Sequence, residues 1–282
     1  MPFEGYKEVC MKLDFRGKKV LITGASMGIG KGLSKCFAKD GAHLFLTDLP
    51  SREDQLMEWA SELEKAHGIK TWTSVVDLTA STGPETLYDE VMTKAGGLDV
   101  LVNNAGICFY GKYSEIPADR LEKMVLLNCL GYAKLMRLFL PSMIERDSGA
   151  VLNVSSVSAF QPLPSLALYA ATKAFTQALT EGISGDLPWR SKVKVATLNP
   201  PFTRTALIDD AGVPEDFIPF TISFKTVDEV VELGYKAFKK GRPFYVPGWQ
   251  NKALHQGIVK FLPRRAVGLI GRLSMKRWSD YL

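Results

Sequence analysis

A tyrosine and a lysine stand four residues apart in Tyr169-Ala170-Ala171-Thr172-Lys173, and Ser156 lies thirteen residues before the tyrosine. Residues four apart on a helix share a face, so the two side chains can point to one spot. A lysine ammonium there favours the phenolate and lowers the phenol pKa, which makes the tyrosine a proton donor and acceptor near neutral pH. Ser156 follows an apolar run typical of a strand, and it could reach the same spot.

The composition is that of an ordinary globular protein. The chain has 282 residues, of which 46% are hydrophobic and 23% charged, and this length suits one large domain. We expect no signal peptide in the acidic and aromatic start, and no apolar stretch of the roughly 18 residues that a membrane-spanning helix needs. The four cysteines lack metal-ligand or CxxC spacing, which favours reduced thiols, a cytoplasmic location and no metal site.

Strand and helix patterns alternate along the chain. Strands are expected over residues 18–23, 42–47, 70–76, 98–102, 150–154, 192–198 and 243–246, and helices over 30–39, 52–66, 84–94, 118–145, 166–184 and 227–240. Continuous apolar runs such as Val100-Leu101-Val102 are typical of strands buried on both faces of a parallel sheet. Pro141 predicts a kink or boundary in the fourth helix. We therefore expect an α/β, single-domain, Rossmann-type doubly wound parallel sheet flanked by helices, with ligands beyond the carboxyl ends of the strands.

A glycine-rich turn, Thr23-Gly24-Ala25-Ser26-Met27-Gly28-Ile29-Gly30, separates the first strand from the first helix. Glycines permit a tight turn and close backbone approach, and the helix N-terminus offers free N–H groups to a pyrophosphate. Such a sequence is often only a turn. Here strand, turn, helix, strand and an acidic residue follow in the order that dinucleotide binding requires.

The acidic residue is Asp48, at the end of the second predicted strand. A carboxylate there can accept hydrogen bonds from both hydroxyls of the adenosine ribose, and it would repel a 2′-phosphate. Met27 also places no basic side chain in the turn, so NAD is favoured. NADP is not excluded, because Lys31 and Arg52 lie nearby and could compensate. Alternatively, Asp48 is only a helix N-cap or turn residue.

The order of these motifs resembles that of the short-chain dehydrogenase/reductase family. The shared motifs are Thr-Gly-x-x-x-Gly-x-Gly, Asn-Asn-Ala-Gly at residues 103–106, Ser156 and Tyr-x-x-x-Lys, and the likeness runs from about residue 18 to residue 248. The resemblance implies that Tyr169 is the acid/base and that Lys173 lowers its pKa and binds the nicotinamide ribose. It also implies that Ser156 holds the substrate oxygen, beside a cofactor that supplies the hydride chemistry.

Further roles follow from the same resemblance. Asn128 would support a water that relays protons from the lysine, and Asn104 would brace the central sheet. The implied cofactor contacts are Gly24, Ser26, Met27, Gly28, Ile29, Gly30, Asp48, Asp77, Leu78, Asn104, Ala105, Gly106, Tyr169, Lys173, Pro200, Thr203 and Thr205. The chain has Pro200-Pro201 where the family usually has Pro-Gly, and this departure leaves the nicotinamide contacts open.

The substrate side is expected to be apolar. The family's substrate lid would span about residues 206–224, and Cys108, Phe160 and Phe202 are predicted to face the substrate. An apolar pocket with few polar anchors suits a hydrophobic alcohol or ketone. The alternative, that these aromatic residues only close the core, has equal weight.

The C-terminal part of the chain is basic. Residues 251–282 contain seven Lys or Arg and one acidic residue, whereas the rest sums to about −1, which gives no reason to invoke nucleic acid. We expect an N-terminal extension over 1–17, a catalytic domain over 18–250 and a basic amphipathic extension over 251–282. This extension can lie on an anionic membrane surface, or pack on a partner subunit or the pocket wall. Packing is favoured.

Together these patterns predict an oxidoreductase that transfers a hydride between NAD(P) and a hydrophobic secondary alcohol or ketone. One alternative is an NADPH-linked 3-oxoacyl thioester reductase. Another is a non-catalytic nucleotide-binding scaffold, although such proteins typically lose the tyrosine or lysine that this chain keeps. The resemblance also implies a homodimer or homotetramer that assembles through the helices at 118–143 and 166–184.

Overall fold

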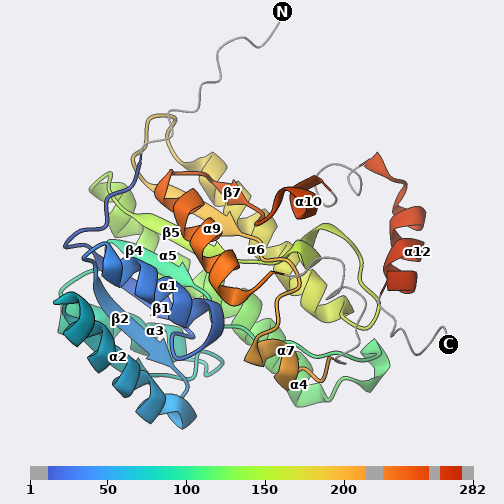
Figure 1. Cartoon of the computed structure of the whole chain (residues 1–282), viewed down its shortest axis with the longest axis horizontal. Helices are drawn as coiled ribbons and strands as arrows, with labels where there is room; N and C mark the ends of the chain where they lie inside the picture. The colour runs from blue at the N-terminus through green and yellow to red at the C-terminus, as the bar shows by residue number, and fades with distance from the viewer. Residues whose placement is uncertain (1–11, 214–224, 254–260, 275–282) are drawn as a thin grey trace, which may run out of the picture.

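The sheet of this computed structural model has seven parallel strands in the order β3-β2-β1-β4-β5-β6-β7 (Figure 1). The structure describes residues 12–213, 225–253 and 261–274. The strands are β1 (Lys19–Thr23), β2 (His43–Asp48), β3 (Thr71–Val75), β4 (Val100–Asn103), β5 (Ala150–Val154), β6 (Lys194–Leu198) and β7 (Phe244–Tyr245). The strand order reverses between β1 and β4, and at such a point ligands bind beyond the carboxyl ends of the strands. The predicted fold is confirmed.

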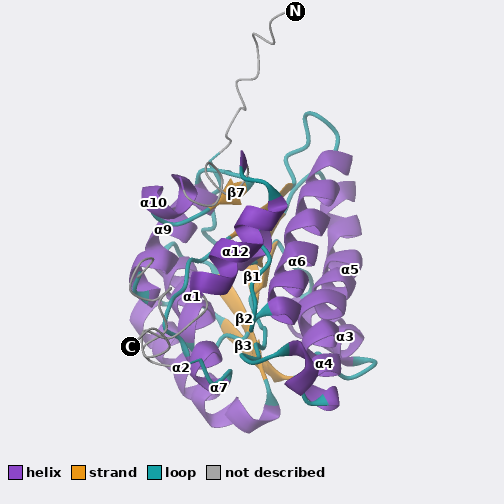
Figure 2. Cartoon of the chain, turned by 90° about the vertical axis from the view of Figure 1, so that its right-hand side faces the viewer, coloured by secondary structure: helices purple, strands orange, loops and turns teal. Residues whose placement is uncertain are grey.

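Helices cover both faces of the sheet (Figure 2). One face carries α1 (Gly28–Lys39), α2 (Glu53–His67) and α9 (Val227–Lys239), and the other carries α3 (Gly83–Ala95), α5 (Tyr132–Glu145) and α6 (Ala167–Asp186). In β1, Val20 and Ile22 belong to the core of the first face, whereas Leu21 belongs to that of the second. All three are fully buried, and each such side chain contributes about 1.5–3 kcal/mol through the hydrophobic effect. Continuous apolar strands are therefore required here.

The fourth predicted helix is continuous but not uniform. It consists of α4 (Ala118–Val125), the π-helical turn η3 (Leu126–Gly131) and α5. Pro141 lies inside α5, so it does not mark a boundary. Phe139 and Met143 on either side of it are buried against the sheet, and this packing holds the helix together.

Contrary to expectation, this 28-residue helix is long and apolar enough to cross a membrane, with a mean hydropathy of 1.3 over its best window. Half of that window is buried inside the protein. A core helix that packs on a sheet meets the same criterion, and its contacts with α3 and the sheet identify it as one.

Among the residues that the structure describes after β7, helices α10 (Trp249–Lys252) and α12 (Arg264–Ser274) follow the sheet. Val267 of α12 is buried, and a Cβ added to Gly271 would lie 2.8 Å from the carbonyl oxygen of Pro162. The glycine therefore lets α12 approach the loop that precedes α6 closely. Whether the basic extension packs on a partner subunit, packs on the pocket wall or contacts a membrane stays a prediction.

Candidate active site

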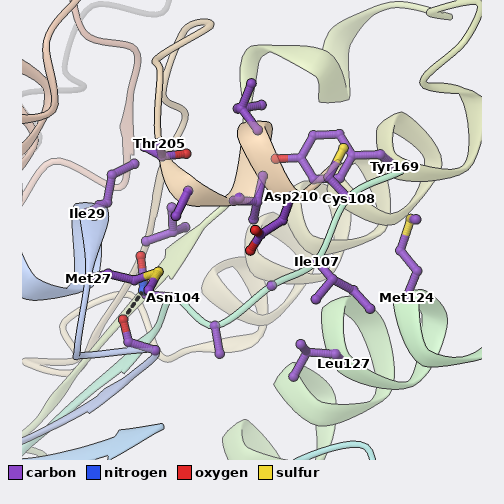
Figure 3. Close-up of a pocket in the computed structure, with 18 of the residues that line it drawn as sticks. Met27, Ile29, Asn104, Ile107, Cys108, Met124, Leu127, Tyr169, Thr205 and Asp210 are labelled. Carbon is purple, nitrogen blue, oxygen red and sulfur yellow. Dashed lines mark hydrogen bonds between the residues drawn. The ribbon is translucent and has the colours of Figure 1, made fainter. Parts of the chain in front are cut away.

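A cavity of about 700 Å³ opens at the carboxyl ends of the strands (Figure 3). It runs from the glycine turn past the ends of β2 and β4 to Tyr169. Of the predicted site residues, those that line it are Gly24, Met27, Gly28, Ile29, Asp48, Asp77, Leu78, Asn104, Ala105, Gly106, Cys108, Ser156, Tyr169, Lys173, Pro200, Phe202, Thr203 and Thr205. The fold thus gathers segments from most of the chain at one edge of the sheet.

The glycine turn is shaped for close contact with a ligand backbone. Gly24 has φ +65°, and a Cβ added to Gly30 would lie 2.1 Å from the Gly24 carbonyl oxygen, so no other residue fits at position 30. Helix α1 has no side-chain cap at Met27 and no acidic residue in its first turn. Its first N–H groups are therefore free to bind an anion such as a pyrophosphate.

Asp48 is held in place by the same turn. Its Oδ2 accepts hydrogen bonds from the backbone N–H (3.0 Å) and the hydroxyl (2.6 Å) of Ser26, and its Oδ1 accepts one from the Leu49 N–H (2.9 Å). Ser26 therefore supports the carboxylate and does not itself line the cavity. A carboxylate offers about four acceptor positions, so Asp48 retains capacity for a ribose hydroxyl.

Asn104 connects β4 to the glycine turn. Its side-chain amide donates to the carbonyl oxygens of Thr23 (2.9 Å) and Gly24 (3.1 Å), while the Thr23 hydroxyl accepts from the Asn104 and Ala105 N–H groups. These bonds join two central strands where their order reverses. The geometry agrees with the bracing role that the resemblance implied.

Ser156, Tyr169 and Lys173 converge at the apolar end of the cavity. Ser156 follows β5 and hydrogen-bonds to the phenol of Tyr169, while its Oγ accepts from the Ser158 N–H at 3.1 Å. Lys173 lies one helical turn after Tyr169 on α6, and its Nζ is 5.6 Å from the Tyr169 ring centroid. That ammonium also donates to the Val154 carbonyl oxygen at 2.9 Å. A phenol, a hydroxyl and a cation thus surround one position.

Burial dominates the pKa values of this group. It lowers the pKa of Lys173 to about 8, against the opposing effect of the Cys108 and Cys129 thiols. The pKa of Tyr169 lies well above 10, because burial and the nearby Cys108 outweigh the hydrogen bond from Ser156. In the protein alone, therefore, the lysine does not bring the tyrosine pKa toward neutrality. A positive charge bound in the cavity would favour the phenolate further.

We predict that Lys173 makes stability depend on pH. Because the folded-state pKa of about 8 lies below the ordinary 10.5, the folded protein releases this proton before the unfolded chain does. The free energy of unfolding should therefore rise between pH 8 and 10.5, by roughly 1–3 kcal/mol from this group. Urea unfolding at pH 7 and pH 10 would measure the effect, and Lys173→Met should remove it. An equal pH dependence in both proteins would contradict the assignment.

Asn128 is fully buried in the π-helical turn and does not line the cavity. Its Oδ1 accepts from the Ile107 N–H (3.0 Å), and its Nδ2 donates to the Ile107 carbonyl (2.9 Å) and to Thr172 Oγ1 (3.1 Å). It therefore ties the strand-end loop of β4 to α6, which carries Tyr169. Its proton-relay role stays a prediction.

Two other predicted residues lie outside the cavity lining. Gly30 is buried beneath the turn, where it makes room for the Gly24 carbonyl. Phe160 does not face the cavity beside Cys108 and Phe202, since its ring packs against Phe244 at a centroid distance of 5.7 Å. Phe160 is half-buried and contacts β7, which differs from its predicted place beside Cys108 and Phe202.

The cavity has lining residues that the motifs did not indicate. They include Arg52 after β2 and Arg120 and Lys123 on α4. Leu207 and Asp210 on α7 (Ala206–Asp210) also line the cavity and fall in the predicted lid, of which residues 214–224 lie outside the described residues. From the sequence, Arg52 is predicted only to offset the charge of a 2′-phosphate. The charged residues of α4 and α7 belong to no sequence motif. Their position at the cavity depends on how these helices approach the sheet.

The fold and the site together define a dinucleotide-binding oxidoreductase. A family model described as short chain dehydrogenase matches residues 18–215. The chain belongs to this family, and the predicted enzyme class, an oxidoreductase of alcohol and ketone groups, is confirmed at the level of the family.

Relatives and solved structures agree with this assignment. The chain is 34% identical to the very-long-chain 3-oxoacyl-CoA reductases of Bos taurus (72% of this chain, 66% of the bovine protein) and Homo sapiens (75% and 69%). It thus spans about two thirds of the length of these relatives. A short-chain dehydrogenase from Sphingobium yanoikuyae, solved with NADPH, matches with a TM-score of 0.76 and 27% sequence identity. The match covers 88% of this chain and 97% of the Sphingobium chain. L-sorbose reductase from Gluconobacter frateurii, solved with NADPH and L-sorbose, matches with a TM-score of 0.71 and 26% identity. That match covers 84% of this chain and 98% of the reductase.

Proposed function

We propose that this protein interconverts a hydrophobic secondary alcohol and its ketone with NAD as the preferred coenzyme. The observation that carries the proposal is the convergence of Ser156, Tyr169 and Lys173 at the apolar end of a cavity whose other end is the glycine turn. The cavity therefore holds proton-transfer groups at one end and a free helix N-terminus at the other. A nicotinamide dinucleotide can span the two.

The proton chemistry falls to the chain's own residues. The Ser156 hydroxyl holds the substrate oxygen, and the Tyr169 hydroxyl gives it a proton in reduction or removes one in oxidation. The Lys173 ammonium stabilises the phenolate that forms. The nicotinamide ring, when bound, supplies or accepts the hydride. Water is kept away by the apolar neighbours of Tyr169, which include Leu163, Leu166 and Ile208.

The coenzyme preference rests on Asp48. Its carboxylate is fixed by Ser26 at the end of β2, it lines the cavity, and it would accept a hydrogen bond from a ribose hydroxyl but repel a 2′-phosphate. Leu49 and Met27 beside it carry no charge. Related structures hold NAD in one case and NADPH in others, so the family alone does not decide the preference.

We expect NADH to bind at least threefold more tightly than NADPH, and hydrophobic ketones to be reduced faster than small polar ones. Coenzyme fluorescence titration and a coenzyme-matched screen of ketones and alcohols would measure both. At least tenfold tighter binding of NADPH would overturn the interpretation of Asp48. Binding of coenzyme without turnover on any compound of the panel would instead favour a scaffold.

A 3-oxoacyl thioester is the second candidate substrate, and two cations favour it. Arg120 and Lys123 project from α4 into the cavity lining, where a phosphate-bearing thioester such as an acyl-CoA could meet them. The similarity to 3-oxoacyl-CoA reductases points the same way. Comparison of an acyl-CoA with an N-acetylcysteamine thioester of the same chain would test it, since only the first carries phosphates. Equal KM values would argue against this substrate.

For assembly we propose a homo-oligomer built on α5 and α6. Ile144 on α5 and Phe175 on α6 are exposed large apolar side chains, as is Leu130 in the adjoining turn η3. Burial of such a surface between copies is favourable. A monomer-only mass by light scattering at micromolar concentration would contradict this assembly.

For the basic extension we propose packing on the loop that precedes α6, together with weak contact to anionic lipid. The inward contact is that of Gly271 with Pro162, whereas Arg265, Leu269 and Arg272 are exposed at helical spacing on the other side of α12. Pelleting with anionic vesicles before and after removal of residues 251–282 would decide the lipid contact. The free thiols of Cys36, Cys108 and Cys129 suit the proposed cytoplasmic location.

A further inference from the structure

Arg52 lies between two carboxylates that belong to opposite sides of the cavity. Its Nη1 is 3.9 Å from Asp48 Oδ1 at the end of β2, and its Nη2 is 3.7 Å from Asp210 Oδ2 at the end of α7. All three residues line the cavity, and Figure 3 shows Asp210 pointing into it. The guanidinium therefore links the wall expected to hold the adenosine ribose to the first helix of the substrate lid.

The two carboxylates are not equivalent. The Asp48 side chain is 5% exposed and fixed by Ser26, whereas the Asp210 side chain is 70% exposed. Among the described residues, Asp210 forms an ion pair with Arg52 and with no other basic residue. The pair with Asp48 should thus persist, while the pair with Asp210 can be exchanged for another anion. Arg52 itself is 28% exposed.

We propose that Asp210 sets the choice of coenzyme, because it holds the Arg52 guanidinium that a 2′-phosphate would need. This inference rests on the proposed function. A 2′-phosphate placed near Asp48 meets its negative charge, and a guanidinium is the group best suited to offset that charge through paired hydrogen bonds. To do so, Arg52 must leave Asp210. NAD has no 2′-phosphate, so its binding does not require Arg52 to move and leaves the Arg52–Asp210 ion pair in place.

The arrangement makes coenzyme choice and the position of the lid helix interdependent. If NADPH binds only after the Arg52–Asp210 pair breaks, then any change that weakens the pair favours NADPH, and NADPH in turn loosens α7. The size of the effect is bounded, because an ion pair this exposed stabilises only modestly. Salt should reduce it, since exposed charges are screened over about 10 Å at 0.1 M ionic strength.

The test compares equilibrium binding of NADH and NADPH to purified wild-type protein and to Asp210→Asn, by coenzyme fluorescence. We expect the Kd for NADPH to fall roughly two- to fivefold in the variant, with the Kd for NADH unchanged within roughly 1.5-fold. Asp209→Asn is the matched control, because this neighbour on α7 forms no ion pair with another described residue. It should leave both Kd values unchanged.

Arg52→Gln gives an independent test that does not rely on Asp210→Asn. It should weaken NADPH binding relative to NADH, and in its background Asp210→Asn should have no further effect on either Kd. An unchanged ratio of the two Kd values in Asp210→Asn, or an equal gain for both coenzymes, would overturn the role of Asp210. Failure of wild-type protein to bind either coenzyme would instead overturn the proposed function.

Discussion

Replacement of Tyr169 by Phe should abolish turnover while coenzyme binding stays within about twofold of wild type. The substitution removes only the hydroxyl that hydrogen-bonds to Ser156 and leaves the ring in its apolar surroundings. A positioned general acid/base contributes about 10²–10⁴-fold to rate, so kcat should fall by at least roughly 100-fold. Initial rates on the best substrate, together with coenzyme titration, would measure the two effects separately.

Tyr113→Phe is the matched control, because this tyrosine is 60% exposed and does not line the cavity. It should leave both kcat and coenzyme binding unchanged. Activity of Tyr169→Phe within tenfold of wild type would mean that another group transfers the proton. A parallel loss of coenzyme affinity would instead show that the phenol is needed for the shape of the site.

The second large effect is expected for Gly30→Ala. The new methyl carbon would lie 2.1 Å from the Gly24 carbonyl oxygen and 2.5 Å from the Asn104 amide nitrogen, and neither group can move without breaking the turn. Overpacking of a rigid site costs about 1–3 kcal/mol, and the displaced turn should no longer present the first N–H groups of α1 to a pyrophosphate. We expect a lower free energy of unfolding, by urea titration, and coenzyme binding weakened at least roughly tenfold.

Gly185→Ala tests whether the loss comes from the turn or from removal of any glycine. Gly185 lies in α6, and a Cβ added there would meet no atom within 4 Å. An alanine in a helix is favoured over glycine by up to about 1 kcal/mol, so this variant should be as stable as wild type or more so. Wild-type coenzyme affinity in Gly30→Ala would show that the turn does not form the pyrophosphate site.

Several features could be predicted from sequence because they depend on neighbours along the chain. Strand β5 has the predicted bounds, and the other strands and the long helices differ from expectation by a few residues at their ends. The shared face of Tyr169 and Lys173 follows from their spacing on α6 in the same way. Polar residues after parallel strands must meet at one edge of the sheet, which is why the glycine turn, Asn104 and Ser156 were correctly placed together.

Other properties depended on burial, which spacing does not reveal. The pKa of Tyr169 is raised although a cation is nearby, because both groups lie in an apolar environment that disfavours charge. Phe160 was expected to face the substrate, yet it packs on β7, since its direction is set by a strand far along the chain. Ser26 does not line the cavity. Its hydroxyl donates a hydrogen bond to Asp48, and this bond connects the turn after β1 to the end of β2.

The sequence by itself determined the fold and the order of the site segments, which follow from periodicity, from glycines at tight turns and from the fixed geometry of one helical turn. The reaction class followed from the family resemblance that these motifs carry. Only the tertiary structure decided how deeply Lys173 is desolvated and that Arg52 reaches Asp210 across the cavity. The physical reason is that charge and solvation depend on every atom packed around a group, including those contributed by distant parts of the chain.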